Sequence, residues 1–179
     1  HCVTRRQRQM CIRDSLETNY FLDYQGVRFI ALNSNVMIDE QMEWLETVLK
    51  NNPHKWTIAF FHHPLYSATT KRDYPERRKR WKPLFDKYGV DLALQGHDHT
   101  YARGSESLYE KNLLTGTNIK DATGTVYVVS VSGPKQYDIK PSWDQYEATR
   151  HKAGANKQLF QVISICLLYT SDAADELRS

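Results

Sequence analysis

Two histidines separated by one residue follow an apolar run in the middle of the chain. The run spans residues 90–95, VDLALQ, and continues into Gly96, His97, Asp98 and His99. In an extended chain, side chains two apart face the same way, with backbone positions roughly 6 to 7 Å apart, so both imidazoles can serve one site. Neutral imidazole is a common ligand of zinc, iron and manganese. The spacing therefore predicts a metal site.

A second apolar run ends in the same manner. Residues 56–61, WTIAFF, are followed by His62, His63 and Pro64. Adjacent residues in an extended chain face opposite ways, and Pro64 favours extended backbone at His63, so we expect only one of the two histidines to reach an ion. The other either faces the substrate or supports the site, or is a packed and hydrogen-bonded residue.

The surrounding pattern predicts an α/β fold that would bring these runs to one edge of a sheet. Residues 26–33, 56–61 and 90–95 read as strands, and apolar residues recur at helical spacing within residues 42–49 and 81–88. This order predicts a βαβαβ unit with parallel strands. Ligands of such sheets bind at the carboxyl ends of the strands, where the histidines lie.

The pattern changes after residue 101. Residues 124–132 and 158–165 read as strands separated by turn-rich segments, without a convincing helix. We therefore expect an antiparallel second sheet. No apolar stretch is long enough to span a bilayer.

The two ends of the chain are related to each other through their coding sequences. Residues 5–15 and 166–176 can be encoded by one nucleotide sequence read from opposite strands. A sequencing adapter translated in both directions explains this relation, whereas a basic arm and an acidic tail do not. We therefore expect residues 1–15 and 166–179 to be adapter sequence and residues 16–165 to be the evolved part.

Without these two ends, neither the net charge nor the cysteine content of the chain indicates a function. The two segments hold five of the 24 Lys and Arg, four of the 21 Asp and Glu, and all three cysteines, so the interior carries a net charge of +2. Such a balance does not predict a nucleic-acid partner. The interior has no cysteine from which a redox compartment could be read.

The two histidine blocks together resemble a known family. The sequence FHHP at residues 61–64, followed by GHDHTYAR at residues 96–103, resembles the second half of a calcineurin-like metallophosphoesterase, nearest the purple acid phosphatases. The resemblance covers most of residues 20–165 and implies part of a four-layer αββα sandwich. It also implies two divalent or trivalent ions of iron, zinc or manganese, with His62 and His97 as ligands of one ion and His99 as a ligand of the other.

The family resemblance implies hydrolysis of a phosphate ester, as in an acid phosphatase acting on monoesters. Earlier family blocks, an Asp near the start, Gly-Asp and Gly-Asn-His, supply the bridging Asp and further ligands, and they do not occur in this sequence. We therefore expect residues 16–165 to be the C-terminal part of a catalytic domain and the chain alone to be inactive. Secretion or a periplasmic location is expected from the resemblance only.

Several other residues have a functional and a structural interpretation. His63 is a candidate catalytic residue on the substrate side, and Tyr101 and Arg103 are candidate substrate contacts that could equally be structural. The basic residues 71–72 and 77–80 are expected to form a solvated helix face. Alternative functions are a phosphodiesterase or nuclease of the same superfamily, or a non-catalytic module that binds a metal or another ligand.

Overall fold

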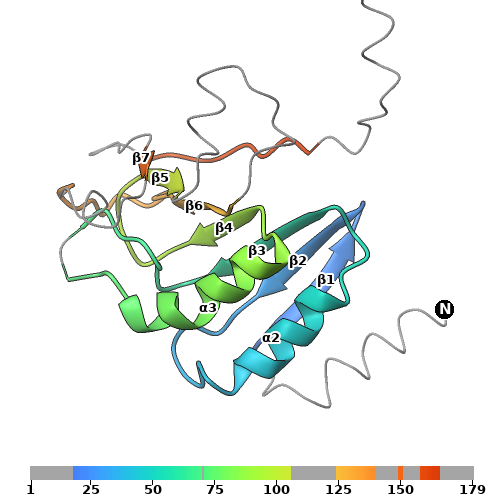
Figure 1. Cartoon of the computed structure of the whole chain (residues 1–179). Coiled ribbons are helices and arrows are strands. Elements are labelled where there is room, and N and C mark those ends of the chain that lie inside the picture. Colours follow the sequence, from blue (N-terminus) through green and yellow to red (C-terminus); the bar gives the residue numbers. More distant parts are fainter. Residues whose placement is uncertain (1–17, 70, 106–123, 140–148, 151–157, 166–179) are drawn as a thin grey trace, which may run out of the picture.

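The computed structural model describes residues 18–69, 71–105, 124–139, 149–150 and 158–165 (Figure 1). Within these residues, seven strands form one sheet in the order β1-β2-β3-β4-β6-β5-β7. The strands are β1 Tyr20–Tyr24, β2 Val27–Ala31, β3 Trp56–Phe61, β4 Leu92–Gln95, β5 Ala102–Ser105, β6 Val126–Val129 and β7 Thr149–Arg150. The helices are α2 Gln41–Lys50 and α3 Pro75–Tyr88.

The predicted βαβαβ unit is confirmed. Strands β2, β3 and β4 are parallel neighbours, and α2 and α3 connect them in sequence. Both helices cover the same face of the sheet (Figure 1). The core lies between this face and the helices, and its fully buried members include Ile30, Leu45, Ala59, Trp81, Phe85 and Ala93. Among the described residues, neither helix combines the length and the hydrophobicity needed to cross a bilayer.

Helix α3 owes its limits to the residues at its ends. It begins at Pro75, where the missing N–H costs nothing because the first turn has no intrahelical acceptor. It ends at Gly89, which adopts a left-handed conformation with φ of 65°. Between them, Trp81 and Phe85 are buried at helical spacing, as the sequence predicted. Pro83 is accommodated inside the helix.

The expectation of a second, antiparallel sheet is wrong for the described residues. Strand β6 pairs in parallel with β4 and extends the first sheet, while β5 pairs with β6 in antiparallel fashion. Residues 158–165 are not a strand. Instead, residues 161–165 lie over the sheet face away from the helices and line a hollow there with β3, β4 and β6. An alternating apolar pattern indicates a half-buried segment but does not specify its pairing partner.

Strand β1 was not anticipated, and it forms a hairpin with β2. Gln25 and Gly26 make the turn with φ of 45° and 75°, the two positive values of a tight type I′ connection. The strands pair in antiparallel register from Tyr20 opposite Ala31 to Tyr24 opposite Val27. This hairpin places β1 at the edge of the sheet.

An ion pair links the hairpin to helix α2. Arg28 is buried, and its side chain donates from Nε and Nη2 to the two carboxylate oxygens of Asp23, at 2.8 and 2.7 Å. Its Nη1 donates to the carbonyl of Val48 in α2 at 2.7 Å. The hydrogen bonds from Arg28 are the main cause that holds the pKa of Asp23 below its ordinary value of 3.8.

Replacing Asp23 with Asn should lower the free energy of unfolding by about 2 kcal/mol near neutral pH, because the buried Arg28 guanidinium loses its counter-charge. The pKa of Asp23 is lowered in the folded chain, so its stabilisation is full above the unfolded value of 3.8 and is lost as the pH falls through the folded pKa. Urea unfolding of both proteins as a function of pH measures this difference.

Asp86→Asn is the matched control, because Asp86 forms an exposed pair with Lys82 at 2.6 Å. This control should change stability by less than about 0.5 kcal/mol. Equal effects of the two substitutions, or a pH-independent effect of Asp23→Asn, would contradict the assignment.

Candidate metal centre

His62 and His97 leave neighbouring strands at one edge of the sheet. Strands β3 and β4 are parallel, and their last paired residues are Phe61 and Gln95. The pairing continues into the loops, because the Gly96 N–H lies 3.2 Å from the Phe61 carbonyl and 3.0 Å from the His62 carbonyl. The sheet therefore brings the two histidines together at its carboxyl edge.

Gly96 leaves the space that His62 occupies. A Cβ atom at position 96 would lie 3.2 Å from the His62 carbonyl oxygen and 3.3 Å from its Nδ1. The next residue, His97, has a φ of 64°, in the left-handed region that non-glycine residues seldom adopt. This backbone turn reorients the chain as it leaves β4.

The rings of His62 and His97 meet through their nitrogens. His62 Nε2 lies 3.0 Å from His97 Nδ1, and the ring centroids are 4.9 Å apart. The other ring nitrogen of His97, Nε2, lies 3.1 Å from the Tyr74 hydroxyl. One nitrogen from each histidine thus faces a common point, while Tyr74 fixes the orientation of the His97 ring.

His63 joins the same cluster. Its ring centroid is 4.9 Å from that of His62 and 4.7 Å from that of His97, and one nitrogen from each of the three rings lies within 4.8 Å of the others. The expectation that adjacent histidines would point apart is wrong, because β3 ends at Phe61 and the next residues form a bend. The buried Ser34 hydroxyl accepts from the backbone N–H of His63 at 2.9 Å. The same hydroxyl lies 3.1 Å from the ring Nδ1 of His63.

Burial and nearby cations keep two of these imidazoles neutral. Burial is the largest cause that lowers the pKa of His63 to about 4, followed by the charge of Arg77. Burial also lowers the pKa of His97, and the charge of Arg72 adds to this effect. Neutral imidazole is the form that binds a metal ion. His63 and His97 are therefore unprotonated at neutral pH, as a metal ligand must be.

His99 lines the same hollow at a separate position. The hollow has a volume of about 420 Å³, and His62, His97 and His99 all contribute to its lining. His99 Nδ1 lies 3.0 Å from the carbonyl oxygen of Lys135. Since a carbonyl only accepts, Nδ1 carries the proton, and Nε2 of the neutral ring has a free lone pair.

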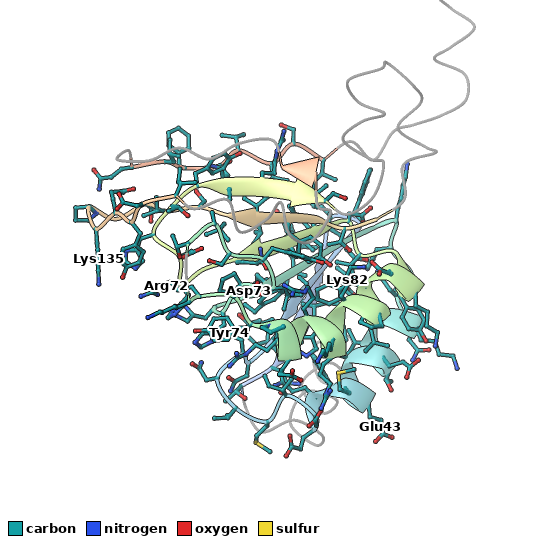
Figure 2. All side chains as sticks on the ribbon, turned by 60° about the vertical axis from the view of Figure 1, so that its left-hand side comes forward. Glu43, Arg72, Asp73, Tyr74, Lys82 and Lys135 are labelled. Carbon is teal, nitrogen blue, oxygen red and sulfur yellow. The ribbon has the colours of Figure 1, made fainter. Side chains whose placement is uncertain are left out.

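Three functional residues escaped the sequence analysis. Arg72, expected on a solvated helix face, donates to the His97 carbonyl and to the Tyr137 hydroxyl, both at 3.1 Å. Figure 2 shows Arg72 and Tyr74 on the same flank of the molecule. Tyr74 and Tyr137 reach the histidines from distant segments without a recognisable motif. No local signal in the sequence distinguishes them.

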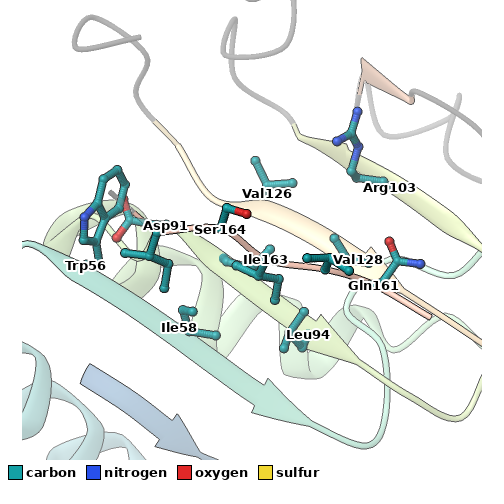
Figure 3. A pocket seen from close by; sticks show the side chains of 13 residues that line it. Trp56, Ile58, Asp91, Leu94, Arg103, Val126, Val128, Gln161, Ile163 and Ser164 are labelled. Carbon is teal, nitrogen blue, oxygen red and sulfur yellow. The ribbon is translucent and has the colours of Figure 1, made fainter. Parts of the chain in front are cut away.

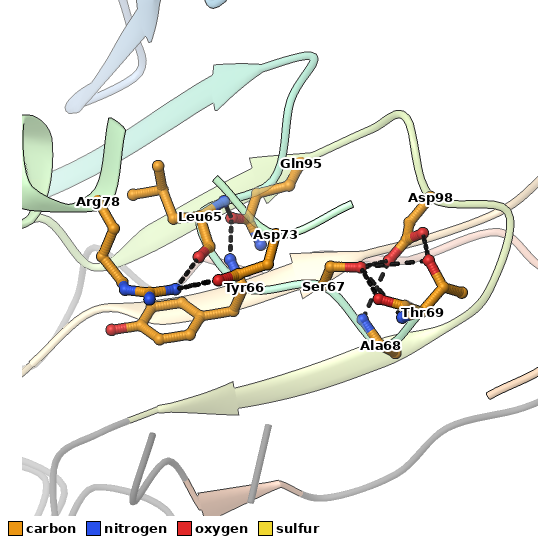
Figure 4. Close-up of polar contacts among 9 residues, drawn as sticks. All are labelled: Leu65, Tyr66, Ser67, Ala68, Thr69, Asp73, Arg78, Gln95 and Asp98. Atoms are coloured by element: carbon orange, nitrogen blue, oxygen red, sulfur yellow. Dashed lines mark hydrogen bonds and ion pairs between the residues drawn. The ribbon is translucent and has the colours of Figure 1, made fainter. Parts of the chain in front are cut away.

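Asp98 anchors the loop that carries His97 and His99. Its carboxylate is buried and accepts from the Ala68 N–H at 3.0 Å and from the hydroxyls of Ser67 and Thr69 (Figure 4). Three donors on one carboxylate fix the loop after β4 against residues 67–69. Asp98 therefore has a structural role next to the site.

Replacing Asp98 with Ala should lower the free energy of unfolding by about 3 kcal/mol, because three buried donors lose their acceptor. Chemical denaturation measures the change. Asp138→Ala, at an exposed position, is the control and should be close to neutral. Equal stability of the two variants would show that the Asp98 hydrogen bonds do not anchor the loop.

Tyr101 and Arg103 are not brought together with the histidines. Neither residue lines the histidine hollow. Arg103 is exposed on β5 and lines the other hollow, on the sheet face away from the helices, with Ile58 and Leu94 (Figure 3). The role of Tyr101 and Arg103 as substrate contacts stays a prediction, without support from the lining of the histidine hollow.

Comparison with known proteins agrees with this fold. The family model of calcineurin-like phosphoesterases matches residues 6–101, more than half of the chain. The chain belongs to this family, and the family implies metal ions and a phosphate ester substrate.

Curated relatives include plant and animal acid phosphatases. Purple acid phosphatase 15 of Arabidopsis thaliana is 30% identical over 122 residues, which cover 64% of this chain and 21% of that protein. Acid phosphatase type 7 of Homo sapiens is 26% identical over 147 residues, which cover 71% of this chain and 31% of that protein. The chain thus spans between a fifth and a third of the length of these relatives.

A solved structure supports the fold. The purple acid phosphatase PPD1 of yellow lupin superposes with a TM-score of 0.55 at 24% identity, covering 72% of this chain and 25% of that one. The predicted metallophosphoesterase-type α/β architecture is confirmed at this level.

Proposed function

We propose that this chain supplies histidine ligands of a dinuclear metal site in a phosphoric ester hydrolase that acts on monoesters, as acid phosphatases do. One observation carries the proposal. His62 Nε2 and His97 Nδ1 approach to 3.0 Å at the carboxyl edge of parallel strands. His62 and His97 would hold one ion, and His99, in the same hollow, would hold the other.

The donor set fits iron, zinc or manganese. Histidines that bind metals usually have their second ring nitrogen held by a hydrogen bond. Here Tyr74 lies at Nε2 of His97, and the Lys135 carbonyl accepts from Nδ1 of His99. These contacts leave Nδ1 of His97 and Nε2 of His99 for ions. When bound, the ions would supply Lewis-acid activation of water and neutralise phosphate charge.

His63 has a different role in this proposal. Ser34 lies at its Nδ1, so the remaining nitrogen, Nε2, can face the substrate. With a pKa of about 4, its imidazole is neutral at physiological pH and can form a hydrogen bond to an ester or phosphate oxygen. We assign His63 to the substrate side of the histidine cluster.

A second ion at this site also needs a bridging anion, because two dications repel each other. Among the described residues that line the hollow, Asp98 has the only carboxylate, and its oxygens accept from Ser67, Ala68 and Thr69. The histidines alone therefore favour one ion over two. The proposed enzyme needs further carboxylate ligands for turnover.

The chain should consequently show phosphatase activity no higher than that of buffer containing the same metal. A p-nitrophenyl phosphate assay with added zinc, manganese or iron measures this. Robust metal-dependent turnover that is lost in a His97→Ala variant would show that the chain itself holds a complete site.

Zinc affinity, measured by calorimetry at neutral pH, tests the ligand assignment. His62→Ala and His97→Ala should each weaken zinc binding at least about 10-fold. Loss of a residue that only supports a metal ligand already lowers metal affinity about 10- to 100-fold, and loss of a ligand should cost no less. His54→Gln is the matched control, since His54 lies beside Asp23 away from the cluster and should bind zinc like the original chain. Unchanged affinity in both cluster variants would refute the metal centre.

A non-catalytic metal-binding module is the second candidate function, because a carboxylate available for bridging is lacking among the described lining residues. Joining residues 16–165 to the upstream reading frame of the gene and assaying phosphate monoesters and diesters would separate the two candidates. We further propose a secreted or periplasmic location for the enzyme, from its family resemblance.

A further inference from the structure

Two cations share one tyrosine ring at the rim of the histidine hollow. The Arg72 guanidinium carbon lies 4.5 Å from the Tyr137 ring centroid, and the Lys135 ammonium lies 5.3 Å from it. Arg72 also donates to the Tyr137 hydroxyl at 3.1 Å. Cations over an aromatic face are held by the ring quadrupole. Tyr137 therefore gathers two positive charges in one place.

This rim is tied to the proposed ligand His99. The Tyr137 N–H donates to the His99 carbonyl at 3.1 Å, and His99 Nδ1 donates to the Lys135 carbonyl at 3.0 Å. The rings of His99 and Tyr137 lie 4.8 Å apart. Arg72 also donates to the His97 carbonyl at 3.1 Å. The two cations are thus positioned relative to the histidines.

The lining of the hollow is positive overall. Arg72 and Lys135 both contribute to it, and Figure 2 shows them on the same flank of the molecule. Asp98 is the acidic residue among the described lining residues, and its carboxylate accepts from buried donors of residues 67–69. Asp138 is exposed and outside the lining. Two cations against the one carboxylate of Asp98 leave the described lining residues with a net charge of +1, which attracts an anion into the hollow.

We propose that Arg72 and Lys135 form an anion-recognition rim that selects dianionic phosphate monoesters over monoanionic diesters. The identity of the ligand rests on the proposed function. The second negative charge of a monoester gains attraction to both cations, and each such contact contributes about a fivefold difference in affinity in water-like surroundings. Guanidinium donors also match the geometry of a phosphate with several free oxygens.

The test is a binding measurement on the purified chain, freed of metal on a chelating resin. Methyl phosphate and dimethyl phosphate are titrated at about pH 8, where the monoester is a dianion because its second pKa is about 6. Ionic strength is held constant, and binding is followed by NMR shifts. We expect methyl phosphate to bind at least about 10-fold more tightly than dimethyl phosphate.

Charge-removing variants locate the source of this preference. Arg72→Gln and Lys135→Gln should each reduce the affinity ratio about fivefold, whereas Arg72→Lys, which keeps the charge, should retain most of it. Lys79→Gln is the matched control, because Lys79 is exposed on α3 and pairs with Glu76. If circular dichroism shows that Arg72→Gln misfolds, the affinity ratios of Lys135→Gln and Arg72→Lys test the proposal in its place.

Equal affinity of the original chain for the two esters would overturn the proposal. So would an affinity ratio that stays the same in both Arg72→Gln and Lys135→Gln. Zinc titration of the same variants separates this outcome from the metal assignment. The rim variants should bind zinc normally, since neither side chain is a proposed ligand. One result would refute the anion-recognition rim and still support the metal centre. In that result, only the His62 and His97 variants lose zinc binding, and the Arg72 and Lys135 variants keep the original ratio of methyl phosphate to dimethyl phosphate affinity.

Discussion

The parallel pairing of β3 with β4 is the constraint on which the site depends. Their ladder ends level at Phe61 and Gln95, and the Gly96 N–H extends the contact to the carbonyls of Phe61 and His62. Because both strands run the same way, the residues that follow them emerge at one edge. The approach of His62 and His97 is therefore a property of the sheet and does not require a bound ion.

Three residues that follow Leu94, namely Gln95, Gly96 and Asp98, each position a different part of the site. Buried Gln95 accepts from the Leu65 N–H at 2.6 Å and so fixes the loop after His62. Gly96 leaves space for the His62 ring, and Asp98 fixes the same loop further along. The ligand-bearing loops are thus held by acceptors buried in the protein, which reduces the reorganisation that ion binding would require.

The sequence allowed the βαβαβ unit and the histidine edge to be predicted, since both follow from local periodicity and from parallel topology. It did not reveal the inward position of His63, because strand alternation was extended past Phe61, where the chain bends. Arg72 and Tyr137 were missed because their contact joins segments 65 residues apart. The parallel partner of β6 was missed for a related reason, since a short apolar strand can pair in either direction.

Cations near the histidines affect the chemistry of the hollow in two ways. The charge of Arg72 adds to burial in lowering the pKa of His97, and Arg77 does the same for His63. Keeping the imidazoles unprotonated preserves their lone pairs for ions, whereas protonated rings would repel a metal. With these imidazoles neutral, the positive charge in the described lining is carried by Arg72 and Lys135, which is where the proposed phosphate ester would meet it. Arg72 takes part in both effects, because its charge helps to keep His97 unprotonated and also lies in the lining that faces an anion. Lys135 takes part only in the second, so the lining can attract an anion without supplying a metal ligand.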